Sequence, residues 1–519
     1  MKILNKIYPL FVFWLGLFSS VNAQSAISPA SPFFNKVIKE EINLNKPDSQ
    51  KYIISAHLTF NRVFICKPRS NYTWVITDRY GVVSDIDGNG LNDIPFTSAD
   101  MTGDQWNPSF PGNAYVAFQT SPGNFQCVAV GNQKDTPYGI SVGDFDGDGD
   151  KDLVYTAARS NGAYTLRNNG GWSFTEQQIG QGGGFPNHIA VRNVDAGPGA
   201  EILYTDEVSS KLFKYNFLTN SLYTLDSVCR EGLSIADLNG DGTQDVVCGA
   251  SNVNAANWLY YKLNLGYWTS PIEISNTIAR WHGIATADLN KDAKIDIVTC
   301  RAANDTGYYS AIYVFYNNGG NIPTFSPQVL PMGNNYEFRE CEVTIADLDC
   351  DGDYDIVWAS GYGNGGVGWL ENNFPNNSWT YHTIELGSYK VYGVAVSYIN
   401  NDKKPDIIAG LNGVTDTTTF TYGLYVYYNT SNIDTTLCLP ITPVDIPEKL
   451  EINAKIEVKG KEVKFILNRN INDKLDIFDV SGKKLWTYYI NGQQLVFRIP
   501  NSGVYVMRLR DKSYKIVVK

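Results

Sequence analysis

Hydrophobic and polar residues alternate along most of this chain in short runs, and one acidic pattern interrupts them seven times. At residues 85, 144, 193, 237, 288, 347 and 398, a hydrophobic run leads into a nine-residue segment rich in Asp, Asn and Gly, and a second hydrophobic run follows. The fullest copy, residues 139–157, reads GISVGDFDGDGDKDLVYTA. Because alternating apolar residues indicate strands, each copy predicts a strand, a turn and a strand.

The hydrophobic pattern continues beyond each acidic segment. Residues 163–179, 311–330 and 365–386 each contain a third apolar run, an Asn-rich turn and a fourth run, as in AYTLRNNGGWSFTEQQI. Turns of the NNGG kind between period-two runs are hairpin signals. Four strands per repeat of roughly 50 residues are typical of a β-propeller blade. The sequence therefore predicts an all-β fold with a seven-bladed β-propeller.

The acidic segment has the chemistry of a calcium loop. In the fullest copy, loop positions 1, 3, 5 and 9 are Asp144, Asp146, Asp148 and Asp152, and position 6 is Gly149. Ca²⁺ takes six to eight oxygen ligands, and the residue at position 7 can add its backbone carbonyl. An EF-hand is rejected, because its last carboxylate is a Glu at position 12 and helices flank its loop.

Five copies carry oxygen-bearing side chains at all four positions. The predicted ligands are Asp85, Asp87, Asn89, Asp93, Asp144, Asp146, Asp148, Asp152, Asp237, Asn239, Asp241, Asp245, Asp288, Asn290, Asp292, Asp296, Asp347, Asp349, Asp351 and Asp355. Position 6 should tolerate a positive φ, and four of these copies have Gly there. The fifth has Ala293, which predicts a weaker site or a slightly different turn.

The other two copies are predicted not to bind calcium well. The third has Asn193, Asp195, Gly197 and Glu201, with Pro198 at position 6, where a positive φ is impossible. The seventh has Tyr398 at position 1 and Lys403 at position 6, and retains Asn400, Asp402 and Asp406. One such loop alone could be an Asp-rich surface turn, but five in phase favour about five structural Ca²⁺ ions that neutralise mutually repelling carboxylates.

The repeats resemble the FG-GAP/VCBS repeats of integrin α-subunit heads and of many secreted bacterial proteins. The resemblance covers about residues 50–430. It implies that each calcium loop joins the innermost strand of a blade to the next strand, and that ligands bind on the opposite face or in the central channel. The same scaffold serves adhesion, sugar binding and polysaccharide lyase chemistry, so it specifies fold better than function.

The two ends of the chain predict export. Residues 1–23 have Lys2 and Lys6, the apolar run FVFWLGLF and Val21-Asn22-Ala23 before Gln24, which is typical of a cleaved signal peptide. No second apolar run of membrane-spanning length follows. We expect an N-terminal linker at 24–50, the propeller at 51–430, a Thr- and Pro-rich linker at 431–448 and a C-terminal domain at 449–519.

The C-terminal domain differs in charge and predicts its own small β-sandwich of immunoglobulin-like type. It has 15 Lys and Arg against 7 Asp and Glu, whereas the whole chain has a net charge of −11. The runs LDIFDVSGKKL, SGVYVMRL and YKIVVK resemble the C-terminal sorting domain of type IX secretion cargo, with Phe478 where Tyr is usual. The resemblance implies recognition by the type IX machinery in the outer membrane of a Gram-negative bacterium. A small β domain with a ligand of its own is the alternative.

The cysteines and the acidic charge limit the bonds, metals and partners that we expect. The eight cysteines could form disulfides in an exported chain, and Cys229 and Cys248 could staple one blade, although spacing alone assigns no pairs. With no CxxC or HExxH segment, no zinc site is predicted. The acidic balance of the propeller argues against nucleic acid.

The residues just before each innermost strand should line the rim opposite the calcium loops. They include Arg79, Glu231 and Glu340, and the proposed ligand-binding set is Tyr80, Tyr138, His188, Arg230, Trp281, His282, Arg339 and Tyr392. These side chains could stack on sugars and pair with acidic groups. They could equally be polar only because strands end there in water.

The sequence thus predicts a secreted or cell-surface calcium-binding propeller that acts in recognition or adhesion, with an extracellular glycan as the preferred ligand. One alternative is a polysaccharide lyase that acts on a uronate-containing glycan by β-elimination. Arg280 or Arg339 would then neutralise the carboxylate, and His188, His282 or Tyr138 would remove the C5 proton. The other alternative is an adhesin that binds a surface protein without sugar specificity.

Overall fold

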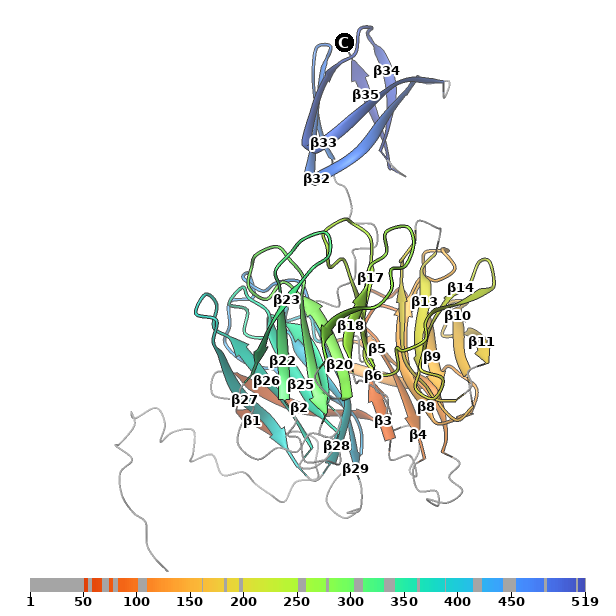
Figure 1. Ribbon diagram of the computed structural model, residues 1–519, viewed down its shortest axis with the longest axis vertical. Helices are drawn as coiled ribbons and strands as arrows, with labels where there is room; N and C mark the ends of the chain where they lie inside the picture. Colours follow the sequence, from red (N-terminus) through yellow and green to blue (C-terminus); the bar gives the residue numbers. More distant parts are fainter. Residues whose placement is uncertain are drawn as a thin grey trace, which may run out of the picture. The chain divides into compact units, whose positions relative to one another are not determined.

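The computed structural model describes residues 51–54, 58–67, 74–77, 83–100, 110–160, 162–181, 184–195, 199–250, 258–276, 280–302, 311–330, 341–361, 365–387, 389–413, 422–441, 454–479, 483–509 and 512–518. Their regular structure is all β, and their strands form eight sheets (Figure 1). Seven of these sheets follow one another along the chain, and we number them sheets 1 to 7. The eighth is the C-terminal sheet.

Sheets 1 to 4 are built from consecutive antiparallel strands. Sheet 1 has β3 (Trp74–Thr77), β4 (Ile94–Ala99), β5 (Pro111–Ser121) and β6 (Asn124–Ala129), with β7 (Lys134–Asp135) paired to β5. Sheet 2 has β8 (Pro137–Gly143), β9 (Asp152–Ala157), β10 (Gly162–Asn168) and β11 (Phe174–Gln181). Sheet 3 has β12 (Pro186–Arg192), β13 (Glu201–Asp206), β14 (Lys211–Asn216) and β15 (Ser221–Asp226). Sheet 4 has β16 (Leu233–Ala236), β17 (Asp245–Gly249), β18 (Leu259–Lys262) and β19 (Ile272–Ser275).

Sheets 5 and 6 repeat this order, and sheet 7 departs from it. Sheet 5 has β20 (Arg280–Ala287), β21 (Asp296–Ala302), β22 (Ala311–Asn317) and β23 (Phe325–Val329). Sheet 6 has β24 (Cys341–Ala346), β25 (Asp355–Ser360), β26 (Gly366–Asn372) and β27 (Trp379–Leu386). Sheet 7 has β28 (Tyr389–Ser397), β29 (Asp406–Gly413) and β30 (Gly423–Asn429), and adds β2 (Thr59–Cys66) and β1 (Lys51–Ile54) from the start of the described chain.

The first strands of the seven sheets contact one another in a cycle. β8 contacts β4 and β12, β12 contacts β16, and the series continues through β20 and β24 to β28, which contacts β3. Figure 1 shows the red and orange β3 near the blue-green β28 and β29. Sequential sheets, a return to the first sheet and a last sheet shared by both ends of the segment are consistent with a β-propeller-like fold.

The apolar core lies between the sheets. The described residues form seven buried apolar clusters that are each shared by two neighbouring sheets, such as the one that packs Trp358 of β25 against Val298 of β21. Large buried side chains gather there because both faces of each sheet are covered, which explains why so many strands read as continuous apolar runs.

The C-terminal sheet has a core of its own. Its order is β31 (Ala454–Lys459), β32 (Glu462–Asp479), β34 (Gly503–Leu509) and β35 (Lys512–Val518), and β33 (Lys484–Arg498) pairs with β32. Phe465, Ile477 and Met507 are buried in one apolar cluster. The runs SGVYVMRL and YKIVVK fall mainly on β34 and β35.

Candidate functional site

The five predicted calcium loops share one hydrogen-bond pattern. The carboxylate at position 1 accepts the backbone N–H groups of position 6 and, in four loops, of position 5. For Asp85, the distances are 3.0 Å from the nitrogen of Asn89 and 2.8 Å from that of Gly90. Asp237, Asp288 and Asp347 repeat this arrangement, and Asp144 accepts from Gly147 and Gly149. The loop backbone therefore fixes the first ligand position before any ion is considered.

The carboxylates of three loops also converge. Three carboxylate oxygens lie within 4.8 Å of one another in each of the sets Asp85, Asp87 and Asp93; Asp144, Asp146 and Asp152; and Asp347, Asp349 and Asp351. The loops that begin at Asp237 and Asp288 carry Asn at position 3 and have the same backbone pattern. Oxygen atoms gathered in this way have the chemistry of a Ca²⁺ site.

In each of the five predicted calcium loops, positions 4 and 6 have left-handed backbone conformation. From the sequence, a positive φ was expected at position 6 only. Position 6 has φ of +86° at Gly90 and +63° at Ala293. The N–H of Ala293 donates to Asp288 at 2.8 Å, as the equivalent glycines do. The alternative of a different turn at Ala293 is therefore wrong, and the weaker site stays a prediction. Position 4 also has positive φ, including +59° at Cys350.

Position 9 contributes to the architecture as well as to the ligand set. Asp152 is fully buried, and its carboxylate accepts the N–H groups of Phe145 in the loop and Asn168 in β10. The same two contacts, from position 2 and from the third strand, recur for Asp93, Asp245, Asp296, Asp355 and Asp406. Burial raises the pKa of Asp152, Asp245 and Asp296 to about 7. A cation beside these groups would favour their charged form.

In five sheets, an Asn at or just after the end of the third strand makes a bond to the loop of a preceding sheet. The side-chain amide of Asn317 donates to the carbonyl of Leu238, at position 2 of the preceding loop, at 2.8 Å. Asn168, Asn264, Asn372 and Asn429 make the equivalent bond. We call these five residues the Asn latches. Sequence reasoning missed them, although the Asn that follows each third apolar run was visible.

The third loop contains a cation from the protein itself. Lys214 forms an ion pair with Asp195 at position 3. Glu201 takes the structural role of position 9, because its carboxylate accepts the N–H of Val194 and the amide of Asn216. Pro198 lies outside the described residues. The predicted lack of a metal ion stays a prediction, and the Lys214 ammonium gives it a physical basis.

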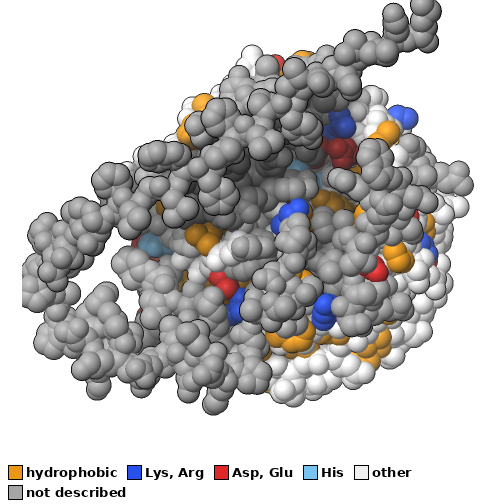
Figure 2. All heavy atoms as spheres, turned by 90° about the horizontal axis from the view of Figure 1, so that it is seen from below, with side chains coloured by type: hydrophobic (Ala, Val, Ile, Leu, Met, Phe, Trp, Pro, Cys, Tyr) orange, Lys and Arg blue, Asp and Glu red, His pale blue; other side chains and the backbone are white. Residues whose placement is uncertain are grey.

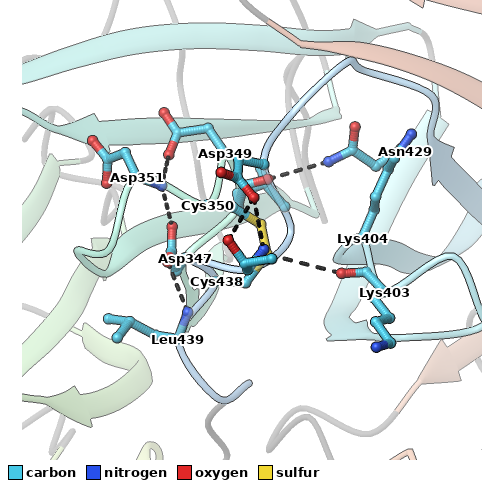
Figure 3. The surroundings of a disulfide bond; sticks show 12 residues. Asp347, Asp349, Cys350, Asp351, Lys403, Lys404, Asn429, Cys438 and Leu439 are labelled. Carbon is cyan, nitrogen blue, oxygen red and sulfur yellow. Dashed lines mark hydrogen bonds between the residues drawn. A yellow bond between two sulfur atoms is a disulfide. The ribbon is translucent and has the colours of Figure 1, made fainter.

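The sixth loop is covered by a segment that follows sheet 7. Cys350, at loop position 4, forms a disulfide with Cys438, and the N–H of Leu439 donates to Asp347 at 2.8 Å (Figure 3). Figure 3 shows Asp347, Asp349 and Asp351 beside this disulfide. Residues 431–441, predicted as part of a linker, therefore contact the loop side of the sheets.

Two further disulfides are Cys66–Cys127 and Cys229–Cys248, and the second confirms the pair considered from the sequence.

The predicted rim residues fall into three groups. Arg79, Tyr80, Arg339 and Glu340 lie outside the described residues, and Arg280 starts β20 with a side chain that is not described. Trp281 is fully buried between sheets 4 and 5, against Tyr313 and Phe315, so it belongs to the core and lines no surface. Tyr138, His188, His282 and Tyr392 are buried at the starts of inner strands, and Arg230 is partly exposed with Glu207 3.4 Å away.

Two of these histidines meet two glutamates. His188 and His282 have ring centroids 5.4 Å apart, and Nδ1 of His282 is 2.7 Å from Oε1 of Glu342. Nε2 of His282 is 3.6 Å from Oε2 of Glu231. All four residues are at most 3% exposed. We call His188, Glu231, His282 and Glu342 the His–Glu cluster. It draws on the starts of β12, β20 and β24 and on the residues before β16.

Glu342 is the member that sequence reasoning missed, and the repeat contained a signal for it. It stands five residues before its loop, where sheets 2, 4, 5 and 7 have Gly139, Gly232, Gly283 and Gly393. A Cβ at Gly139 or Gly232 would lie 2.4 or 2.1 Å from a carbonyl oxygen of the neighbouring sheet. Only His188 and Glu342 replace this glycine in sheets 2 to 7. Figure 2 shows only small areas of pale-blue histidine surface on the face that it views.

The comparisons with known proteins support the repeat. Residues 237–299, from the fourth loop to β21, match the FG-GAP-like repeat. No curated protein matches the sequence significantly. The described residues include no helix with the length and hydrophobicity needed to cross a membrane.

Solved structures give distant similarities only. PorZ, a surface component of the type IX secretion system of Porphyromonas gingivalis, is 11% identical over 91% of this chain and 70% of its own, with a TM-score of 0.39. The V. cholerae biofilm matrix protein Bap1 is 13% identical over 90% and 83%, with a TM-score of 0.33. Penicillium chrysogenum α-L-arabinanase is 12% identical over 74% and 100%, with a TM-score of 0.38. At these scores the similarities carry no functional argument.

Proposed function

We propose that this protein is an exported, calcium-stabilised seven-bladed β-propeller that recognises a glycan at the cell surface or in the surrounding medium. The observation that carries the proposal is the set of five acidic loops with one repeated backbone pattern, each at the end of a first strand in a cycle of sheets. Calcium ions in these loops stiffen one face of the propeller. The opposite face and the central channel remain for a ligand.

Recognition is a better proposal than catalysis. A lyase needs a base that can reach the C5 proton of a polymeric substrate. Among the described candidates, His188 and His282 are each 1% exposed and Tyr138 is 6% exposed. Nδ1 of His282 already lies 2.7 Å from Glu342. These contacts favour a structural or metal-binding role for the histidines, and they leave sugar contact to partly exposed groups such as Arg230.

A glycan array tests the proposal. The mature chain, in buffer with Ca²⁺, should bind a subset of acidic glycans, and Arg230→Ala should weaken that binding. Tyr267→Ala removes an aromatic ring that is 65% exposed in the β18–β19 turn, so it is the matched surface control. No retained sugar would favour the protein-binding adhesin instead. A rise in ultraviolet absorbance with uronate polymers, caused by a new C4=C5 double bond, would favour the lyase.

We propose further that residues 449–519 direct export through the type IX system. The described part of this segment has its own apolar core, and its runs LDIFDVSGKKL and YKIVVK resemble cargo sorting domains. Deletion of this segment from the full chain should leave the protein in the periplasm of a bacterium that has the system. Normal release of the shortened chain would contradict this assignment and would leave the glycan proposal untouched.

A further inference from the structure

The His–Glu cluster has a donor set unlike that of the acidic loops. The ligand atoms of His188, His282 and Glu342 all lie within 4.8 Å of one another, and each side chain is buried. The three come from β12, β20 and β24, in sheets 3, 5 and 6. Two imidazoles and one carboxylate form a common set for zinc and related dications, whereas Ca²⁺ prefers oxygen ligands alone.

Both histidines lie at an irregularity that also occurs in β8 and β28, whereas Glu342 lies in the regular strand β24. In β12 the pairing register shifts between Pro186 and Ile189, and in β20 it shifts between Trp281 and Ile284. The first shift encloses Asn187 and His188, and the second encloses His282 and Gly283. A bulge of this kind changes the direction of a side chain relative to a regular strand, and bulges are frequent next to functional sites.

We propose that His188, His282 and Glu342 bind one transition-metal dication of the zinc class, separate from the calcium loops. Nitrogen and oxygen ligands lie about 2.0–2.2 Å from Zn²⁺, so ligand atoms around one ion are roughly 3–3.5 Å apart. The 2.7 Å between His282 and Glu342 and the 4.8 Å limit for the whole set bracket this spacing. Glu231 lies 3.6 Å from Nε2, on the other side of the His282 ring from Glu342, where it would orient that ring.

This ion would connect sheets that lie apart in the sequence. The acidic side chains of each loop come from one repeat, whereas His188, His282 and Glu342 belong to three different sheets. A bound dication would take the place of the direct contact between His282 and Glu342. It would link the three strands β12, β20 and β24. The site goes beyond glycan recognition, because it requires no sugar and no calcium.

Cobalt is the probe for this site, because Co²⁺ with nitrogen ligands absorbs visible light and Ca²⁺ does not. The full mature chain is stripped with a chelator, returned to excess Ca²⁺ and titrated with Co²⁺. We expect one Co²⁺ per chain with a visible absorption band that excess Ca²⁺ does not remove. We expect at least a tenfold loss of Co²⁺ affinity in His188→Gln, His282→Gln and Glu342→Gln.

The matched control is His382→Gln. His382 is also buried, stacks on Trp369 and lies 2.6 Å from Glu371, but it is outside the cluster. It should bind Co²⁺ as the wild type does. If a cluster variant does not fold, X-ray absorption at the zinc edge of the zinc-loaded wild type decides the question, because imidazole ligands give multiple-scattering features. No visible band, unchanged binding in the folded cluster variants, or an all-oxygen shell would overturn the proposal.

Discussion

The acidic loops and the His–Glu cluster differ in how the sequence encodes them. Each loop is built from residues within nine positions, and the same contacts recur from Asp85 to Asp347. The cluster brings together residues 188, 231, 282 and 342, one from each of four repeats. What repeats in this chain supports the scaffold, and what departs from the repeat marks the place where the sheets enclose a site of different chemistry.

Removal of calcium should give the largest effect and would test the role of the repeated loops directly. A ligand that binds only the folded chain stabilises it by mass action, by about 2.7 kcal/mol per site at 100 times its Kd. With about five sites, a calcium chelator should lower the Tm by roughly 10 °C or more in calorimetry. Magnesium added back in excess is the control, because it prefers six ligands in octahedral geometry. An unchanged transition would contradict the calcium assignment.

The next effect should come from the disulfide that covers the sixth loop. Cys350→Ser with Cys438→Ser frees residues 431–441 and removes the restraint on loop position 4. We expect a loss of about 2–4 kcal/mol in the free energy of unfolding. We also expect weaker binding of one calcium ion in a calorimetric titration.

The control for that disulfide is Cys229→Ser with Cys248→Ser, a pair outside the acidic loops. It should lower stability and leave every calcium affinity unchanged. Equal calcium binding by both double variants would show that the covering segment does not contribute to the sixth site.

An Asn latch should have a smaller effect. Asn317→Ala removes the amide that donates to the carbonyls of Leu238 and Ile295, so one buried and one partly buried acceptor lose this donor. We expect a loss of about 1–3 kcal/mol in urea unfolding. Asn318→Ala, one residue further on and exposed, is the control and should change stability by less than about 0.5 kcal/mol. Similar losses in both variants would mean that the latch does not join the sheets.

The last expected effect is a pH dependence from the seventh loop. Burial raises the pKa of Asp406 from 3.8 to about 8. Between these values the folded chain holds a proton that the unfolded chain has released, so this group lowers stability as pH rises from about 4 to about 8. In saturating Ca²⁺, Asp406→Asn should have a flatter plot of Tm against pH than the wild type. Exposed Asp402→Asn should keep the wild-type slope, and a wild-type slope in Asp406→Asn would contradict the prediction.

Short-range patterns were enough to predict the strands and the loops. Period-two apolar runs and Asp at fixed spacing specify a strand, a turn and a strand locally, and Ala293 adopts the same turn as the glycines it replaces. The Asn latches could not be assigned because their partners lie about 80 residues away, as in the 79 residues between Asn317 and Leu238.

The cluster was predicted only in part, for a physical reason. Sequence phase placed His188 and His282 at the starts of inner strands, but alternation could not show which residues a bulge turns into the core. It therefore grouped Trp281, which packs against Tyr313, with His282, and it omitted Glu342. No short metal-binding motif marks the cluster, because it forms only when distant repeats meet.

Sheet 7 can fold only late in synthesis. Its outer strand β2 pairs with β30, so Phe60 lies opposite Asn429 although 369 residues separate them. During synthesis this pairing must wait until β30 has left the ribosome, and contacts of such long sequence separation slow folding. Sheet 7 therefore combines the first and last strands of the seven-sheet segment to be made, and it can be completed only after the strands of the other six sheets have been synthesised.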